Sequence, residues 1–217
     1  MSKAVQTAVM GVTGYAGAEL ARLLVRHPRL KGATPVFLGR AEASRDAKVP
    51  TLGEIHPHLH DSHGTGNLPV EPFSFELMED LGVEVLFLAT PHELSRELVP
   101  QARKRGIRVI DLSGAWRLEA GENRAVYRFE DEGSADALQM QAEAVYGMPE
   151  LHRAAIHGAG LVANPGVLCD ERYLGAEAAG AGRPGGSGAR DYCGCQKRRE
   201  RRGESTDGED ALHVRGG

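Results

Sequence analysis

The chain has 217 residues, a formal net charge of −4 and a hydrophobic fraction of 41%, which are ordinary values for a soluble globular protein. The charge balance favours neither a nucleic-acid nor a membrane partner, and no run approaches the roughly 18 apolar residues of a membrane span. The first residues lead into a strand rather than a signal-peptide core, so we expect a cytoplasmic protein.

The first predicted elements are a strand over residues 7–10 and a helix from Ala16, whose apolar positions recur at helical spacing until Pro28. Between them, residues 11–17 place their glycines as GxxGxxG. Such glycines let the backbone turn tightly and approach a pyrophosphate, whose charge the helix N-terminus then meets. A plainer interpretation is that the glycines only permit the turn. The candidate coenzyme-binding residues here are Gly11, Thr13, Gly14, Tyr15, Ala16 and Gly17.

A second strand is predicted over residues 35–38, and Gly39 and Arg40 stand at its end. A site selective for NAD usually places Asp or Glu about twenty residues past the glycine motif, to bind the ribose 2′-hydroxyl. No acid stands here, and a guanidinium at this place can pair with a 2′-phosphate. We therefore predict NADP as the coenzyme and Arg40 as the residue that selects it. The alternative is a solvated arginine.

The polar stretch over residues 39–80 is rich in Gly, Pro and His, and we expect mostly loop with short elements. It contains alternating histidines, of which His56, His58 and His60 are the first three. Their spacing on a Pro-containing loop is not that of a zinc site. We therefore predict a structural loop and no bound metal.

The strongest strand signal covers residues 83–89, whose nearly continuous apolar content is typical of a central parallel strand. A helix over residues 93–105 ends at a glycine and leads into a strand over residues 107–110. A last strand over residues 160–163 runs into Asn164. Strands that alternate with helices predict a Rossmann-like α/β fold with a doubly wound, mainly parallel sheet.

Polar residues follow three of these strands, at the carboxyl edge where open α/β sheets bind ligands. Capping of the following helix or turn is an equally good account of those after the strands over 83–89 and 107–110. The further candidates for contact with the coenzyme are Thr90, Pro91, His92, Ser113 and Asn164.

Five segments, in the same order along residues 5–166, resemble the N-acetyl-γ-glutamyl-phosphate reductases, enzymes of arginine biosynthesis related to aspartate-semialdehyde dehydrogenase. The segments are GVTGYAGAE (11–19), FLATPHELS (87–95), VIDLSGAWRL (109–118), VYGMPELH (145–152) and LVANPG (161–166). The resemblance implies NADPH-dependent reduction of a small acyl phosphate. The substrate forms a thioester on an enzyme cysteine, releases phosphate and accepts hydride to give the semialdehyde.

In the family, the nucleophilic cysteine directly follows Asn-Pro-Gly, a histidine much further along acts as acid and base, and a second domain completes the substrate site and the subunit contacts. Here Gly166 is followed by Val167, which cannot form a thioester. We therefore assign no catalytic residue and expect the chain as written to be inactive, without the homo-oligomer contacts of the family. An aspartate-semialdehyde dehydrogenase-like enzyme and a non-catalytic NADP-binding module are the alternatives, although residues 145–152 argue against the former.

Composition changes after Gly166. Of the 51 residues over 167–217, five are Leu, Ile, Val, Phe, Met or Trp and eleven are Gly, while nine basic and nine acidic residues cancel. So little apolar surface does not offset the entropy of ordering a chain. We therefore expect an NAD(P)-binding domain over residues 1–166 and a disordered tail over 167–217. Three interpretations of the tail compete: a metal- or nucleic-acid-binding tail that uses Cys193 and Cys195, a flexible linker, and a reading-frame error.

The frame error is a specific hypothesis. Synonymous codons for Val167–Leu174 can be chosen so that the frame displaced by one base encodes CYATSVIL, which begins with a cysteine at the position of Val167. Codons remain available for a continuation through the tail that resembles the family. We therefore hypothesise one extra base where the codons of Gly166 and Val167 meet.

Overall fold

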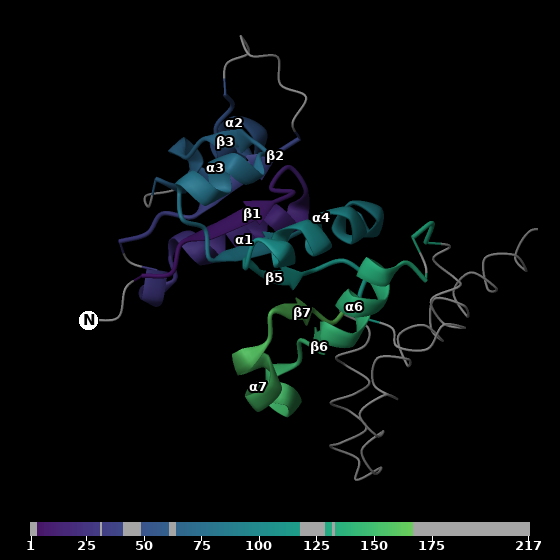
Figure 1. Cartoon of the computed structure of the whole chain (residues 1–217). Helices are drawn as coiled ribbons and strands as arrows, with labels where there is room; N and C mark the ends of the chain where they lie inside the picture. The colour runs from purple at the N-terminus through teal and green to yellow at the C-terminus, as the bar shows by residue number, and fades with distance from the viewer. Residues whose placement is uncertain are drawn as a thin grey trace, which may run out of the picture. The chain divides into compact units, whose positions relative to one another are not determined.

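The computed structural model describes residues 4–30, 32–40, 49–60, 64–117, 129–131 and 133–166. The chain divides into two units, residues 1–116 with 131–165 and residues 117–130 with 166–217. The fold described below is that of the first unit (Figure 1). The tail over residues 167–217 lies outside the described residues, so its expected disorder and the domain boundary after Gly166 stay predictions.

The described part of the first unit is built on one sheet of seven strands: β1 (Thr7–Met10), β2 (Val36–Gly39), β3 (Val70–Pro72), β4 (Val85–Leu88), β5 (Arg108–Asp111), β6 (Val145–Tyr146) and β7 (Leu161–Ala163). Their order is β3-β2-β1-β4-β5-β7-β6, and every neighbouring pair is parallel. From β1 the chain winds outward to β2 and β3 and then returns to β4, on the other side of β1. The predicted doubly wound α/β fold is confirmed, and its winding reverses between β1 and β4.

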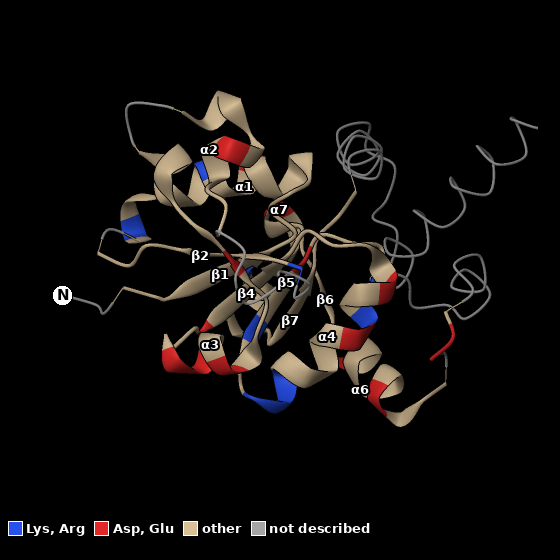
Figure 2. Cartoon of the chain, turned by 90° about the horizontal axis from the view of Figure 1, so that it is seen from above, with Lys and Arg blue, Asp and Glu red and all other residues tan. Residues whose placement is uncertain are grey.

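Helices cover both faces of this sheet, as right-handed crossovers between parallel strands require. Those in the described residues are α1 (Tyr15–Val25), α2 (Leu52–Ile55), α3 (Phe75–Asp80), α4 (His92–Lys104), α6 (Ala135–Glu143) and α7 (Pro149–Gly158). Figure 2 shows α1, α2 and α7 on one face and α3, α4 and α6 on the other. None of these helices has the length and apolar character needed to cross a membrane.

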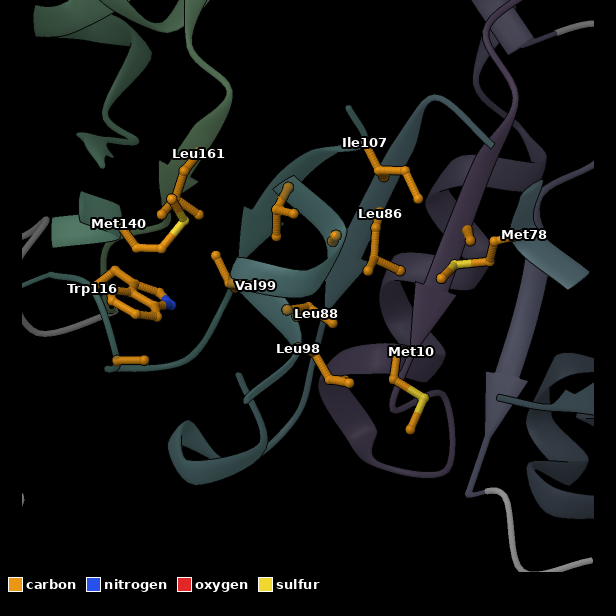
Figure 3. Close-up of a cluster of buried hydrophobic side chains, with 14 of the residues drawn as sticks. Met10, Met78, Leu86, Leu88, Leu98, Val99, Ile107, Trp116, Met140 and Leu161 are labelled. Carbon is orange, nitrogen blue, oxygen red and sulfur yellow. The ribbon is translucent and has the colours of Figure 1, made fainter. Parts of the chain in front are cut away.

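Side chains alternate across each strand, so each face of the sheet has its own core. On the face covered by α3, α4 and α6, Leu86 and Leu88 of β4 belong to one cluster with Met10, Leu98 and Trp116 (Figure 3). Trp116, the single tryptophan, has no exposed surface. This cluster extends from α3 to β7 and joins the central strands to the helices of that face.

The opposite core joins the start of the fold to the histidine-containing segment. Val9 of β1 and Val12 of the glycine turn pack in one cluster with Ala18 of α1 and with Leu52 and Leu59. Because both leucines are fully buried or nearly so, residues 52–59 are anchored against the turn by apolar contacts.

Strands and helices predicted from apolar patterns are found within a residue or two of their predicted bounds. The stretch over residues 39–80 contains short elements, as expected: β3, α2 and α3 have three, four and six residues. The strand β3 has three residues and ends at Pro72, and β6 has two. Neither is long enough to display the alternation of apolar and polar residues by which a strand is predicted. The sequence pattern also leaves α6 and α7 unpredicted.

Candidate functional site

Four adjacent parallel strands, β1, β4, β5 and β7, end at the same edge of the sheet, and predicted site residues follow each of them. Backbone hydrogen bonds join the strand ends: Ala89 N to Met10 O at 2.9 Å, Leu112 N to Leu88 O at 2.9 Å, and Asn164 N to Asp111 O at 2.8 Å. The edge contains the point between β1 and β4 where the winding reverses. Open α/β sheets bind their ligands at such points, so this edge is the candidate site.

The three glycines of the turn have different structural roles. Gly11 has a positive φ of 91°, and a Cβ there would overlap the carbonyl group of Ala89. A Cβ at Gly17 would overlap the Gly11 carbonyl and lie 2.7 Å from Cα of Val12, so close packing requires glycine at both positions. A Cβ at Gly14 would meet only Gly11 O, at 3.7 Å, and φ there is −91°. The protein's own packing does not require glycine at position 14, which leaves open space where a ligand would approach α1.

The backbone around Gly14 presents hydrogen-bond donors to solvent. Thr13, Gly14, Tyr15 and Ala16 are all exposed, and no side chain caps the N-terminus of α1. The Gly14 N–H donates to Gly11 O at 3.2 Å, whereas the amides of Thr13, Tyr15 and Ala16 have no acceptor among the described residues. Together with the positive end of the helix, these amides fit a diphosphate group.

The negative charge on α1 is paired along the helix. Glu19 accepts a hydrogen bond from Arg22 Nε at 2.8 Å, and this contact lowers the pKa of the Glu19 carboxyl below its usual value. The negative charge of Glu19 is therefore balanced on α1 itself by Arg22.

Arg40 directly follows β2, the strand beside β1, and so lies at the same edge as the glycine turn. The side chain is exposed, and the described residues give it no ion-pair partner. An exposed guanidinium here is available to a phosphate group, but exposure is equally compatible with a solvated arginine. Its selection of NADP stays a prediction.

Thr90, Pro91 and His92 form the turn between β4 and α4. Pro91 is the N-cap residue of α4 and no side chain caps this helix, so capping does not account for Thr90. Thr90 Oγ1 is buried without a hydrogen-bond partner in the described part of the chain, and its Cγ2 would lie 3.3 Å from a Cβ on Gly11. A buried hydroxyl without a partner costs about 1–3 kcal/mol, which a ligand bound there would offset. His92 Nε2 pairs with Glu93 Oε1 at 2.9 Å.

Ser113 is held by the carboxylate of Asp111, which is not among the predicted site residues. Asp111 ends β5 and is fully buried, and it accepts from the Ser113 amide at 3.1 Å and from the Ser113 hydroxyl at 2.7 Å. The Ser113 oxygen in turn accepts from the amide of Ala115 at 3.1 Å. The hydroxyl proton is therefore already used, and Ser113 can only accept from a ligand. An Asp two residues before a Ser at a strand end is the local signal that points to such a turn.

Asn164 directly follows β7, and its side-chain Nδ2 donates to the Pro165 carbonyl at 3.1 Å. Its backbone bond to Asp111 continues the pairing of β5 with β7 beyond the last strand residue. The predicted site residues at the ends of β5 and β7 are thus brought together, whereas Val167 lies outside the described residues.

The histidine segment contributes one buried side chain to the glycine turn. His56 is 8% exposed, and its Nε2 lies 2.8 Å from the carbonyl oxygen of Val12. His58 and His60 are exposed, and within the described ranges no three His, Cys, Asp or Glu side chains are placed to hold a metal ion. A hydrogen bond between residues 44 positions apart leaves no local pattern in the sequence from which it could be predicted.

A doubly wound parallel sheet with a glycine turn between β1 and α1 at its reversal point defines a Rossmann-like NAD(P)-binding domain. Residues 6–159 match the family described as semialdehyde dehydrogenase, NAD binding domain. The chain therefore belongs to the semialdehyde dehydrogenase family of oxidoreductases.

Curated relatives carry a more specific name. The N-acetyl-γ-glutamyl-phosphate reductase of Moorella thermoacetica is 36% identical over 171 residues, which cover 79% of this chain and 45% of that protein. The protein of the same name from Thermus thermophilus is 41% identical over 160 residues, which cover 73% of this chain and 40% of that protein. The chain thus spans less than half the length of these relatives.

A solved structure shows the same fold. Aspartate-semialdehyde dehydrogenase II of Vibrio cholerae matches with a TM-score of 0.52 and 15% sequence identity, over 82% of this chain and 46% of that chain. At this level of identity the likeness concerns the fold alone.

Proposed function

We propose that this chain is the coenzyme-binding part of an N-acetyl-γ-glutamyl-phosphate reductase and that it binds NADP. The observation that carries the proposal is the turn over residues 11–17. There Gly14 leaves open space before the exposed amides of α1, while Gly11 and Gly17 serve the packing of the turn itself. The names of the relatives support an acyl phosphate as the substrate class.

In such a reaction, a thiolate would displace phosphate from the acyl phosphate to give a thioester. NADPH would supply the hydride that, with a proton, gives the semialdehyde and frees the thiol. The role of this chain is to bind the coenzyme: the amides of Thr13, Tyr15 and Ala16 donate to its diphosphate, and Arg40 pairs with its 2′-phosphate. The buried hydroxyl of Thr90 is a further polar group at the same turn.

Arg40 provides the test of coenzyme choice. A hydrogen bond between charged groups is worth about 1.5–3 kcal/mol, so Arg40→Ala should weaken NADPH binding by about tenfold to a hundredfold and leave NADH binding unchanged. Isothermal titration calorimetry of the full chain with each coenzyme measures both. Arg29→Ala removes another exposed arginine and should change neither affinity.

The outcomes of this titration are separable. Equal affinities of the unmutated chain for NADPH and NADH would contradict the NADP preference while leaving coenzyme binding intact. Absence of binding to either coenzyme would contradict the proposed function itself.

Val167 favours a second candidate, a non-catalytic NADP-binding module, because valine at the nucleophile position offers no thiol. Both candidates predict coenzyme binding without consumption of NADPH when the acyl phosphate is added. Turnover above background by the purified full-length chain would contradict both. An aspartate-semialdehyde dehydrogenase-like enzyme is less favoured, because the relatives at 36% and 41% identity carry the other name.

A further inference from the structure

His56 is the buried histidine beside the glycine turn, and the inference drawn from it rests on the proposed function. We propose that His56 is a positioning residue for the coenzyme. By donating from Nε2 to the Val12 carbonyl, it holds the Val12–Thr13 peptide so that the Thr13 N–H faces the diphosphate site.

The direction of the Thr13 amide follows from peptide geometry. A trans peptide is planar, so the C=O of Val12 and the N–H of Thr13 point in opposite directions. The Val12 carbonyl points to His56, with 2.8 Å between O and Nε2, and both residues are buried. The Thr13 N–H therefore points away from His56, toward the side of the turn where residues 13–16 are exposed.

His56 is the partner on which this carbonyl depends. No backbone N–H of the described residues donates to Val12 O, so removal of the imidazole would leave a buried carbonyl without a donor. A carbonyl only accepts, which requires that Nε2 carry the proton. The imidazole therefore acts here as a fixed donor.

The segment that carries His56 is anchored on both sides of this residue. The His56 backbone N–H donates to Leu52 O at 2.7 Å, and Leu52 and Leu59 are buried in the same cluster as Val12. Thr51 caps α2, with its N–H donating to Glu54 Oε2 at 2.8 Å and its hydroxyl accepting from Glu54 N at 3.3 Å. A donor on such an anchored segment can fix the orientation of a peptide whose carbonyl has no other hydrogen-bond partner.

The test compares His56→Leu with His56→Gln in the full chain. Leucine fills a similar volume without a donor, whereas the glutamine amide carries N–H donors at nearly the distance of Nε2 from Cα. Titration calorimetry with NADPH should show binding about tenfold or more weaker in His56→Leu. In His56→Gln it should be restored to within about threefold. His157→Leu, which removes an exposed histidine of α7, should bind like the unmutated chain.

Hydrogen exchange of the peptide over residues 11–17, measured without coenzyme, is a second readout. Exchange should be faster in His56→Leu and unchanged in His56→Gln and His157→Leu. Where His56→Leu does not fold, His56→Asn takes its place, because its shorter amide does not reach the carbonyl.

Each outcome bears on one proposal. Failure of the unmutated chain to bind NADPH would overturn the proposed function, and with it the role of His56 toward the coenzyme. Unchanged NADPH binding in His56→Leu, equal binding by His56→Asn and His56→Gln, or equal weakening in His157→Leu would overturn this inference alone.

Discussion

A Cβ on Gly17 would overlap the carbonyl oxygen of Gly11 and lie 2.7 Å from Cα of Val12. These are backbone atoms in a close-packed turn and cannot move aside as the end of a side chain can. Gly17→Ala should therefore lower the free energy of unfolding by about 1–3 kcal/mol, as measured by urea denaturation followed by circular dichroism. Gly158→Ala is the control, because nothing lies within 4 Å of a Cβ there. Equal stability of the two variants would contradict the assigned packing role.

Gly14→Ala, in contrast to Gly17→Ala, should weaken coenzyme binding more than it lowers stability. The new Cβ meets only Gly11 O, at 3.7 Å, and alanine in place of glycine at a helix N-cap costs about 1 kcal/mol or less. The methyl group would nevertheless stand where the diphosphate approaches the exposed amides, so NADPH binding should weaken by about tenfold or more. Thermal unfolding and coenzyme titration of the same sample measure both effects. Undiminished NADPH affinity would show that the coenzyme does not approach at this glycine.

The buried bond from Trp116 Nε1 to Ser95 Oγ, 3.2 Å long, joins the loop after β5 to α4. Both residues have no exposed surface, so Ser95→Ala would leave the indole N–H without this acceptor and should destabilise the fold by about 1–3 kcal/mol. Urea unfolding followed by circular dichroism measures the change. The same substitution in a Trp116→Phe background should have a smaller effect, because no indole N–H remains to be left unpaired. Equal effects in the two backgrounds would refute the coupling.

The frame hypothesis concerns residues outside the described part of the chain and is decided by the nucleotide sequence. The codons of residues 167–174 should spell CYATSVIL in the frame displaced by one base. Removing one base at the junction of the Gly166 and Val167 codons should then give a product with cysteine at position 167. Codons that do not encode this peptide would end the hypothesis.

Local patterns were sufficient for the elements that form the site edge. The strands that became β1 and β4 are predicted from short apolar runs, and the turn over residues 11–17 from the spacing of its glycines, because each signal lies within a few adjacent residues. The edge strands β3 and β6 have three and two residues and are held by their neighbours in the sheet, so they carry no pattern of their own. The carboxylate of Asp111 is missed for another reason, since its burial depends on the packing of β5 between β4 and β7.

The amino-acid sequence alone determined that the chain alternates strands with helices, that a glycine turn opens the first helix, and that valine follows Asn164-Pro165-Gly166. Only the tertiary structure decided which glycines serve packing, that the Ser113 proton is already bound by Asp111, and that His56 supports the Val12 carbonyl. The reason is physical. Periodicity and turn chemistry act between neighbours along the chain, whereas steric overlap and buried hydrogen bonds depend on distances between segments that only the folded sheet brings together.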